Sequence, residues 1–434
     1  MLSLIVLVTC GAVLLSLPIS SNTGQSTSWV DAWFTSASAL SVTGLAVVDT
    51  KTHWSLFGQS VILALIQIGG LGFMVGASLL LAMFRRGESL RDQLLLHDGS
   101  PTLDVGSSRA IAYRTMKFTL LAEAIGASIL TLRFSRVEPW PSALWDGIFH
   151  AISAFCNAGF DRMGGGQSLA GYADSRVVNI TIMLLIQAGS LSLLVLSEAW
   201  HARSWRQLSL EAKLVLSLNA LLVAIGTGSF LLLEWNASLS SLHPADRPMA
   251  AVFQSIAART AGFATVDFSQ VTSLTTALWI PIMMIGGASG SAAGGVKLAT
   301  FAVLVLAVTA TLRGATHTQI AGRRITSTQV MQALAVTMIY VAAQAVLTFA
   351  LGVAEIRAGH VDVPILSLLF ESMSALATVG LSVGITAELS TVSKLILGVA
   401  MLFGRVGPLV LAYSLRTNRP PARFTYPEET LRLG

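Results

Sequence analysis

Long apolar runs alternate with short aromatic-rich segments along the whole chain, and the alternation occurs four times. A run of about 20 apolar residues can cross a bilayer as a helix, whereas a run of about 12 is typical of a buried or re-entrant segment. The long runs are Leu2–Ile19, Val61–Phe84, Thr115–Phe134, Val177–Trp200, Leu208–Trp235, Leu274–Val308, Val330–Val353 and Leu395–Leu415. The short segments are Trp29–Leu40, Leu144–Phe155, Met249–Ala258 and Ile365–Leu376.

A glycine followed by a large apolar residue lies shortly after each short segment. These glycines, Gly44, Gly159, Gly262 and Gly380, lie 115, 103 and 118 residues apart. Phe34, Phe149 and Phe370 each precede the corresponding glycine by ten residues, so the quarters align without gaps. Repetition with a period of about 110 residues indicates one structural unit used four times.

The pattern therefore predicts an all-α membrane protein with eight transmembrane helices. Each of its four parallel repeats is a helix, a pore half-helix, a filter loop and a second helix, and the repeats surround one pseudo-fourfold pore. The predicted division is residues 1–84 for repeat A, 85–114 for a cytoplasmic loop, 115–200 for repeat B, 208–308 for repeat C, 327–415 for repeat D and 416–434 for a cytoplasmic tail.

Composition and charge agree with this reading. The chain is 53% hydrophobic and 11% charged, whereas soluble proteins carry about 25% charged residues. With the glycine loops placed outside, the inner segments hold 16 basic and eight acidic residues, and the outer ones hold nine basic and 13 acidic residues. Because cytoplasmic segments are enriched in Lys and Arg, both termini are expected in the cytoplasm. The basic excess is thus a topology signal, and we expect no nucleic acid partner.

The apolar N-terminus and the two cysteines complete this picture. Residues 2–19 lack a basic start and a clear cleavage site, so they favour a retained helix over a secretory signal. Cys10 and Cys156 are not spaced as a disulfide pair or as a metal-ligand cluster. Serine-nucleophile motifs, His/Glu metal pairing and paired intramembrane carboxylates are absent, so the sequence does not indicate an enzyme.

The glycine motifs are candidates for a cation filter. Irregular backbone at membrane depth is tolerated where it is buried in protein or lines water. Glycine permits backbone conformations that other residues avoid, and a ring of backbone carbonyls can replace the hydration shell of an ion. The alternative is that these glycines only permit turns or close helix packing. One motif alone does not decide between the two interpretations, but four motifs at matching positions favour the filter.

These motifs, TGL, CNAGF, RTAGF and ATVGLS, resemble the Trk/Ktr/HKT superfamily of potassium transporters, and the likeness covers the whole chain. With eight spans, and with a similar tail at Arg423–Glu429, the chain looks like the KtrB branch. The resemblance implies potassium coordination by carbonyls of Val42, Thr43, Gly44, Asn157, Ala158, Gly159, Thr260, Ala261, Gly262, Thr378, Val379 and Gly380. In some plant relatives a serine replaces the first glycine and sodium is favoured, whereas Gly44 is present here.

Residues 285–297, hereafter the gate segment, interrupt the second long run of repeat C. Five glycines favour a broken helix there, and Ser289 and Ser291 could face water; a small-residue face for close helix packing is the alternative. Lys297 follows valine, so the segment is not a phosphate-binding loop. The resemblance implies an intramembrane gate formed by Gly286, Gly287, Ser289, Gly290, Ser291, Gly294, Gly295 and Lys297.

Arg405 is the second gate candidate. A charge deep in a span is costly and marks function by default, and the resemblance implies that this arginine projects into the pore below the filter. Glu123 is a weaker candidate, for which a structural hydrogen bond is equally expected. Arg259 precedes a filter loop and is expected to brace it.

The leading hypothesis is potassium uptake across the plasma membrane by a multi-pass protein. A sodium-selective or sodium-coupled cation transporter is the nearest alternative, with sodium as a coupling or activating ion. A secondary transporter of an organic solute is the rival from another class, but such transporters often use inverted repeats. The resemblance further implies a homodimer, surrounded by membrane lipids, on a cytosolic KtrA-type nucleotide-binding ring. This chain contains no nucleotide motif, so a partner would have to supply nucleotide control.

Overall fold

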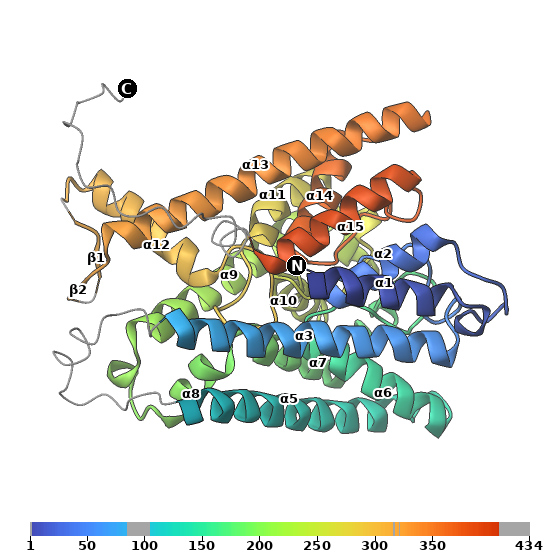
Figure 1. Ribbon diagram of the computed structural model, residues 1–434, viewed down its shortest axis with the longest axis horizontal. Coiled ribbons are helices and arrows are strands. Elements are labelled where there is room, and N and C mark those ends of the chain that lie inside the picture. Colours follow the sequence, from blue (N-terminus) through green and yellow to red (C-terminus); the bar gives the residue numbers. More distant parts are fainter. Residues whose placement is uncertain (1, 85–104, 316, 321, 408–434) are drawn as a thin grey trace.

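The computed structural model describes residues 2–84, 105–315, 317–320 and 322–407, and this part of the chain is mostly helical (Figure 1). The α-helices are α1 (Leu2–Ser16), α2 (Trp29–Ser41), α3 (Leu56–Phe84), α5 (Val105–Phe134), α6 (Trp140–Phe155), α7 (Arg176–Ser190), α8 (Leu193–His201), α9 (Leu210–Glu234), α10 (Arg247–Ala257), α11 (Ser273–Met284), α12 (Leu298–Leu312), α13 (Ser327–Ala358), α14 (Ile365–Leu376) and α15 (Thr391–Val406). The strands β1 (Gln319–Ile320) and β2 (Arg323–Arg324) pair antiparallel. Short 3-10 turns lie at Pro18–Ser20, Ala170–Tyr172, Trp205–Gln207, Ser238–Ser241 and Phe268–Gln270.

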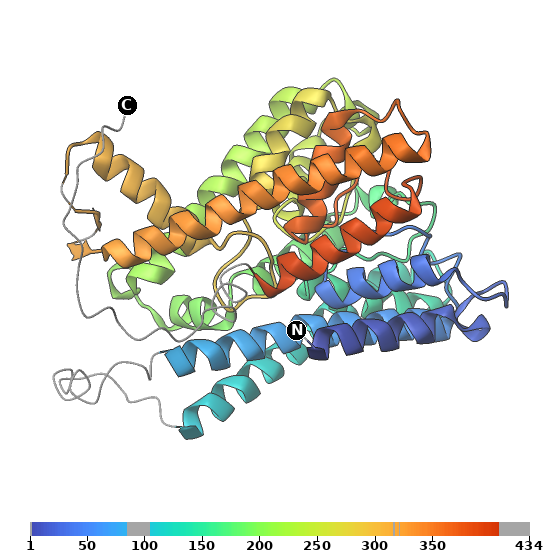
Figure 2. The same cartoon turned by 45° about the horizontal axis from the view of Figure 1, so that its top comes forward.

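Each short helix of the predicted pattern packs against the long helix before it. The pairs are α1 with α2, α5 with α6, α9 with α10 and α13 with α14. The helix that follows a short one contacts the next short helix, in the pairs α3 with α6, α7 with α10, α11 with α14 and α15 with α2. The last pair returns to the start of the chain, so the helices close into a ring. Figure 2 shows α15 beside the N-terminal helices, as this closure requires.

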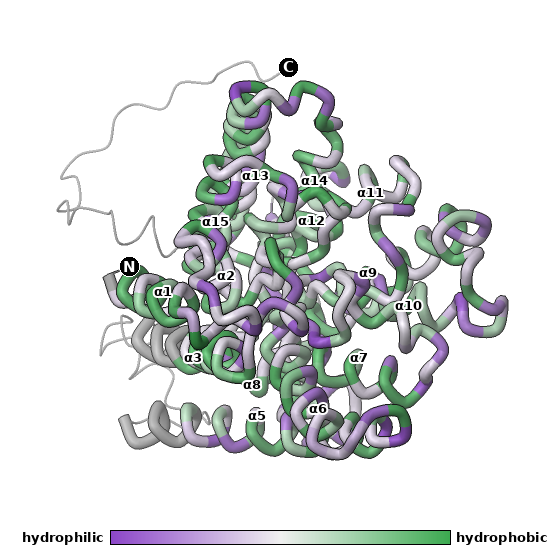
Figure 3. The backbone as a smooth tube through the Cα atoms, turned by 90° about the vertical axis from the view of Figure 1, so that its right-hand side faces the viewer, coloured by the Kyte–Doolittle hydropathy of each residue, from purple (hydrophilic) through white to green (hydrophobic). Residues whose placement is uncertain are grey.

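The ends of the short helices nearest the glycine loops are buried, and the long helices carry most of the exposed large apolar side chains. In α2, every residue from Phe34 to Ser41 is buried, including several serines. Large exposed apolar side chains lie instead on the long helices, for example Leu132, Leu184, Leu232 and Phe349. Figure 3 looks along the helices and shows α1, α5 and α13 at the periphery. Apolar surface of this extent is expected where helices face lipid.

Helix lengths match the predicted spans in part. Within the described residues, four stretches are long and apolar enough to cross a membrane, namely Leu56–Val75, Ala112–Phe134, Leu210–Glu234 and Ser327–Ala358. The pair α7 and α8 adds a fifth if it counts as one span, because the two helices meet at a bend of 104°. The remaining apolar helices, α1, α11 and α12 among them, are shorter. The prediction of eight spans is therefore not established by helix length.

Two predicted boundaries were wrong. The run Val177–Trp200 is not one helix but breaks between Ser190 and Leu193. Part of the expected loop 85–114 is helical, because α5 begins at Val105; residues 85–104 lie outside the described part. The run Leu274–Val308, by contrast, breaks where a broken helix was expected. Two helices are separated by the gate segment, so no continuous small-residue helix face exists there. Residues 408–434, which include the predicted tail, also lie outside the described part.

Candidate functional site

The four glycine loops share an unusual backbone conformation. Two residues before each glycine, Val42, Asn157, Thr260 and Thr378 adopt φ values of 58°, 59°, 71° and 52°. The glycines themselves have φ values of 94°, 69°, 72° and 91°. A positive φ is strained for valine and threonine, at about 1–3 kcal/mol per residue, and such strain clusters at functional sites. The same strained turn therefore occurs four times, once at the end of each short helix.

These loops meet in a closed ring. A Cβ atom on Gly44 would lie 2.2 Å from the carbonyl oxygen of Ala158, and one on Gly159 would lie 2.8 Å from that of Ala261. A Cβ atom on Gly262 would lie 2.7 Å from the oxygen of Val379, and one on Gly380 would lie 2.0 Å from that of Thr43. Each glycine thus abuts a carbonyl of the next loop, and the fourth abuts the first. The structure brings the four predicted filter loops together into one ring, and no side chain fits at its four glycine positions.

Hydrogen bonds from the short helices support the ring. The Gly44 N–H donates to Ser38 Oγ and the Gly380 N–H to Ser374 Oγ, each at 3.1 Å. Ser153, at the same position of the second loop, donates instead to the Phe160 carbonyl at 2.7 Å. The third loop has Ile256 at this position. Sequence reasoning missed these serines, although a serine six residues before three of the four glycines was a visible signal.

Glu371 of α14 supports the residues that follow the fourth glycine loop. Its carboxylate accepts hydrogen bonds from Ser382 Oγ at 2.6 Å, from the Val383 N–H at 3.0 Å and from Thr386 Oγ1 at 2.8 Å. Glu371 is fully buried. A buried carboxylate with three donors is well satisfied, so it fixes the segment that follows Gly380. Sequence reasoning missed this residue as well.

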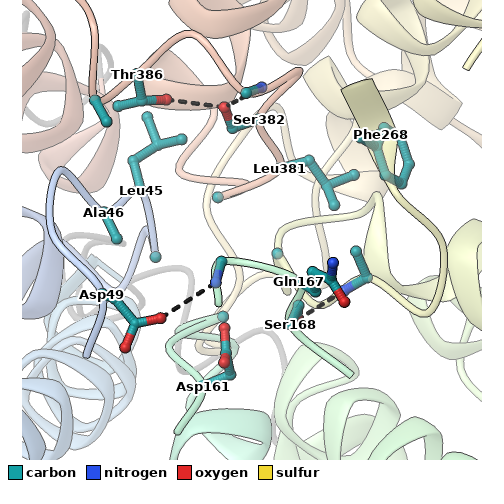
Figure 4. Close-up of a pocket in the computed structure, with 18 of the residues that line it drawn as sticks. Leu45, Ala46, Asp49, Asp161, Gln167, Ser168, Phe268, Leu381, Ser382 and Thr386 are labelled. Atoms are coloured by element: carbon teal, nitrogen blue, oxygen red, sulfur yellow. Dashed lines mark hydrogen bonds between the residues drawn. The ribbon is translucent and has the colours of Figure 1, made fainter. Parts of the chain in front are cut away.

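A pocket of about 300 Å³ opens above the ring (Figure 4). Gly44, Gly159, Gly262 and Gly380 all line it. Figure 4 shows Asp49, Asp161, Ser382 and Thr386 around it, on loops from three parts of the chain. The pocket therefore joins the four glycines to a polar mouth lined by three aspartates, Asp49, Asp161 and Asp267.

Two of these carboxylates, Asp49 and Asp161, are held differently. Partial burial raises the pKa of Asp49, but hydrogen bonds from Thr52, Gly166 and Lys51 outweigh burial and hold this pKa below its usual value. The Gly166 N–H donates to Asp49 Oδ2 at 3.1 Å and so ties the outer loops of two quarters together. Burial raises the pKa of Asp161 to about 6, aided by nearby Asp49 and opposed by the Met163 N–H. Near neutral pH both groups are negative, which attracts cations.

Gly69, Gly189, Gly286 and Gly404 each lie in, or just after, the helix that follows a filter loop, and three of them make equivalent contacts. A Cβ atom on Gly69, Gly189 or Gly404 would lie 2.0, 1.8 or 1.8 Å from the carbonyl oxygen of Leu40, Phe155 or Leu376, the fourth residue before a filter glycine. Gly286 differs, because its Cβ atom would meet the Gly294 oxygen at 1.8 Å. In the third quarter, therefore, Gly286 packs against the gate segment, whereas the corresponding glycines of the other three quarters pack against a short helix.

The gate segment is a buried loop closed at its neck. The Gly286 N–H donates to the Val296 carbonyl and the Val296 N–H to the Met284 carbonyl, each at 2.9 Å. Its far side reaches the fourth filter loop, since a Cβ atom on Gly294 would lie 2.0 Å from Thr378 Oγ1. The expectation that Ser291 faces water was wrong: the residue is fully buried and donates to the Ala288 carbonyl at 2.7 Å. Ser289 is half-buried.

Arg405 connects this segment to α3. Its guanidinium donates to the Gly69 carbonyl at 2.8 Å and to the Ala292 carbonyl, and only 4% of the residue is exposed. Lys297 donates to the Ala293 carbonyl at 2.6 Å, and both cations lie over the Phe73 ring, at 4.6 Å for Arg405 and 5.3 Å for Lys297. Within the described residues, no ion pair involves either cation. Two basic side chains without an ion-pair partner among the described residues thus lie together at the gate segment.

The other two ionisable candidates lie outside this cluster. Glu123 accepts a hydrogen bond from Gln67 Nε2 at 3.1 Å, so the structural bond considered for it is present. Arg259 is buried, and its Nε has no partner within the described structure. We find no hydrogen bond by which its side chain braces the third loop.

The chain resembles known transport proteins over nearly its whole length. Residues 5–422 match the family TrkH, described as "Cation transport protein". The "Ktr system potassium uptake protein B" of Bacillus subtilis (strain 168) is 39% identical over 417 residues, which cover 95% of this chain and 92% of the relative. Its namesake from Vibrio alginolyticus is 39% identical over 430 residues, 98% of this chain and 91% of the relative.

A further relative and one solved structure extend the comparison. The "Potassium/sodium uptake protein NtpJ" of Enterococcus hirae is 34% identical over 432 residues, covering 99% of this chain and 95% of the relative. The crystal structure of the potassium transporter TrkH from Vibrio parahaemolyticus superposes with a TM-score of 0.70 at 21% identity, over 96% of this chain and 83% of that one. At this identity the superposition establishes a shared fold.

Proposed function

The chain belongs to the TrkH family of cation transport proteins, and from this premise we propose that it takes up potassium across the plasma membrane through the ring of four glycine loops. It is a multi-pass membrane protein and a transporter, not an enzyme. The single observation that carries the proposal is the closed ring in which each filter glycine abuts a carbonyl of the next loop. Carbonyls in a ring replace the hydration shell of a potassium ion, and the twelve filter residues would supply them.

The architecture we propose for this pore is four repeats around one pseudo-fourfold axis, with eight spans. The cyclic contacts between each long helix and the next short helix support it. The pocket above the ring is then the outer mouth, and Asp49 and Asp161 raise the local concentration of cations there. By the distribution of Lys and Arg, both termini lie in the cytoplasm.

The gate segment and Arg405 form the gate in this proposal. The Arg405 guanidinium, which has no carboxylate partner in the described structure, opposes the passage of a cation while the segment is in place, and Lys297 lies beside it. The Gly294 contact with Thr378 connects this barrier to the filter. Opening then requires the segment to leave Arg405, because their hydrogen bond holds it between α3 and α15.

Regulation by a second protein is part of the proposal. The names of the two relatives that are 39% identical speak of a "Ktr system", which implies further subunits. We propose a homodimer on a cytosolic nucleotide-binding ring that moves the gate segment.

A sodium-related function is the second candidate, because one relative at 34% identity is named a potassium/sodium uptake protein. Sodium would then be a transported or coupling ion. An organic solute is disfavoured, since a Cβ atom on Gly159 or on Gly380 would lie 2.9 or 3.2 Å from the Gly262 backbone, which leaves a narrow passage.

Growth of a potassium-requiring strain that carries this gene, with and without a nucleotide-binding partner subunit, tests the proposal. We expect growth at low potassium, and potassium flux into proteoliposomes that hold the purified chain. Flux of sodium without potassium would favour the second candidate. Flux of neither ion, from a chain that elutes as a folded protein, would refute the proposed function.

A further inference from the structure

The break between α7 and α8 leaves two backbone acceptors inside the protein. The chain turns by 104° between Ser190 and Leu193, although neither glycine nor proline occupies residues 190–192. Ser192 has a φ of 59°, which is strained for serine. The last carbonyls of a helix have no partner within that helix. The oxygens of Gly189 and Ser190 therefore need donors from elsewhere.

The gate segment supplies both donors. The Ala288 N–H donates to the Ser190 carbonyl at 2.8 Å, and the Ala292 N–H donates to the Gly189 carbonyl at 3.0 Å. Ala288, Ala292 and Ser190 are all buried. Because backbone groups at membrane depth must be satisfied internally, the end of α7 and the gate segment complete each other.

Apolar packing joins α8 to the same place. Leu191 and Val195 share one buried cluster with Ile285, Ala288 and Leu298, which flank or belong to the gate segment. The contact is tight, since a Cβ atom on Gly287 would lie 2.4 Å from the Ser190 carbonyl oxygen and 2.7 Å from Ala293 Cβ. A displacement of the α7–α8 corner must therefore move the gate segment or break its hydrogen bonds.

Beyond this corner, α8 leads to an exposed stretch. Trp200 at its end is 87% exposed, and Arg203, Trp205 and Arg206 are exposed as well. Glu198 accepts a hydrogen bond from Ser209 Oγ at 2.9 Å, which ties α8 to the start of α9. In Figure 1, α8 lies near the same end of the molecule as β1 and β2, away from the short helices. Because this stretch is exposed, another molecule on that side of the protein can contact the end of α8.

We propose that the corner between α7 and α8 is the seat of the closed gate segment, and that movement of α8 releases it. The proposal rests on the gate assigned above. The carbonyls of Gly189 and Ser190 hold the segment on one side, and Arg405 holds it on the other. The break between α7 and α8, in the second quarter, then helps to hold the gate segment of the third quarter closed.

Gly287→Ala tests the seat because its methyl group pushes the segment away from Ser190. We expect potassium flux through proteoliposomes of the full chain to rise at least tenfold, with the ratio of potassium to sodium flux unchanged. Gly228→Ala is the matched control, since no atom lies within 4 Å of its added Cβ. Flux equal to that of the control in a folded Gly287→Ala protein would overturn the seat.

A second variant removes a hydrogen bond of the gate segment without adding a methyl group. Lactic acid introduced at position 288 by nonsense suppression replaces the peptide N–H with an ester oxygen and so removes the bond to Ser190. We expect a several-fold rise in potassium flux with unchanged ion preference. Unchanged flux would count against the seat even if Gly287→Ala did not fold.

Arg405→Ala separates this inference from the proposed function. If Arg405→Ala raises flux and neither change at 287 nor 288 does, the gate stands and the seat is wrong. If none of the three raises the flux of a conducting wild-type chain, the gate assignment fails, and the seat with it. If the wild-type chain moves no potassium, the proposed function itself is refuted.

Discussion

Replacing Gly44 by serine perturbs the ring of filter loops at a single defined contact. A Cβ atom there would lie 2.2 Å from the Ala158 oxygen and 3.0 Å from Gly159 Cα, whereas ordinary contacts begin at 3.4 Å. The second loop must therefore retreat by about 1.2 Å, the difference between 3.4 and 2.2 Å. The φ of 94° adds strain of about 1–3 kcal/mol for any residue with a side chain.

A shift of this size exceeds the roughly 0.5 Å within which functional constellations must be held. An interaction of a carbonyl with a charged group contributes about 1.5–3 kcal/mol, and each 1.4 kcal/mol is about a tenfold change in equilibrium constant. If the displaced Ala158 carbonyl no longer coordinates potassium, we expect the preference for potassium over sodium to fall at least tenfold.

Potassium and sodium flux into proteoliposomes, measured under equal gradients, gives this preference directly. Gly72→Ser in α3 is the matched control, because no atom lies within 4 Å of its added Cβ. A folded Gly44→Ser protein that keeps the wild-type preference would refute the assignment of this ring as the selectivity filter.

Four further outcomes follow from the site. Arg405→Ala removes two hydrogen bonds to carbonyls, each of about 1.5–3 kcal/mol for a charged donor, so flux should rise at least tenfold with unchanged selectivity; lower flux contradicts the gate. Deleting Ala288–Ala293 should likewise raise flux, and a folded but silent transporter would argue against it. Uptake should weaken as external pH falls from 7.5 to 5.5, because the Asp161 carboxylate, with a pKa of about 6, is charged above and neutral below that value. Asp161→Asn should abolish this pH dependence. Glu371→Ala leaves three donors of the fourth loop unpaired, at about 1–3 kcal/mol each, so the thermal midpoint should fall clearly, whereas an unchanged midpoint would show that Glu371 does not brace the loop.

The pattern of apolar and small residues was sufficient for the local features of the site. The short helices lie within a few residues of their predicted positions, since a 12-residue apolar segment before a glycine is readable without knowledge of its neighbours. The four filter motifs were found by repetition, and the structure brings them together. The supports behind them, Ser38, Ser374 and Glu371, were missed, because a buried polar side chain is informative only once its partner is known.

Hydropathy predicted the length of the run Val177–Trp200 but not its break. A helix stays continuous when its own N–H groups are the best donors for its carbonyls. The sequence of the helix alone does not show whether donors from a distant segment will replace them. For the carbonyls of Gly189 and Ser190 the donors are the N–H groups of Ala292 and Ala288, about a hundred residues later in the chain.

The sequence by itself determined which segments are apolar, where backbone strain is permitted by glycine, and that a charge at Arg405 sits in an apolar run. Only the tertiary structure decided how these features meet. It placed the Arg405 guanidinium on carbonyls of Gly69 and Ala292, and it turned Ser291 away from water. The physical reason is that buried polar groups must be paired, and the partners of Arg405 lie in other quarters of the chain.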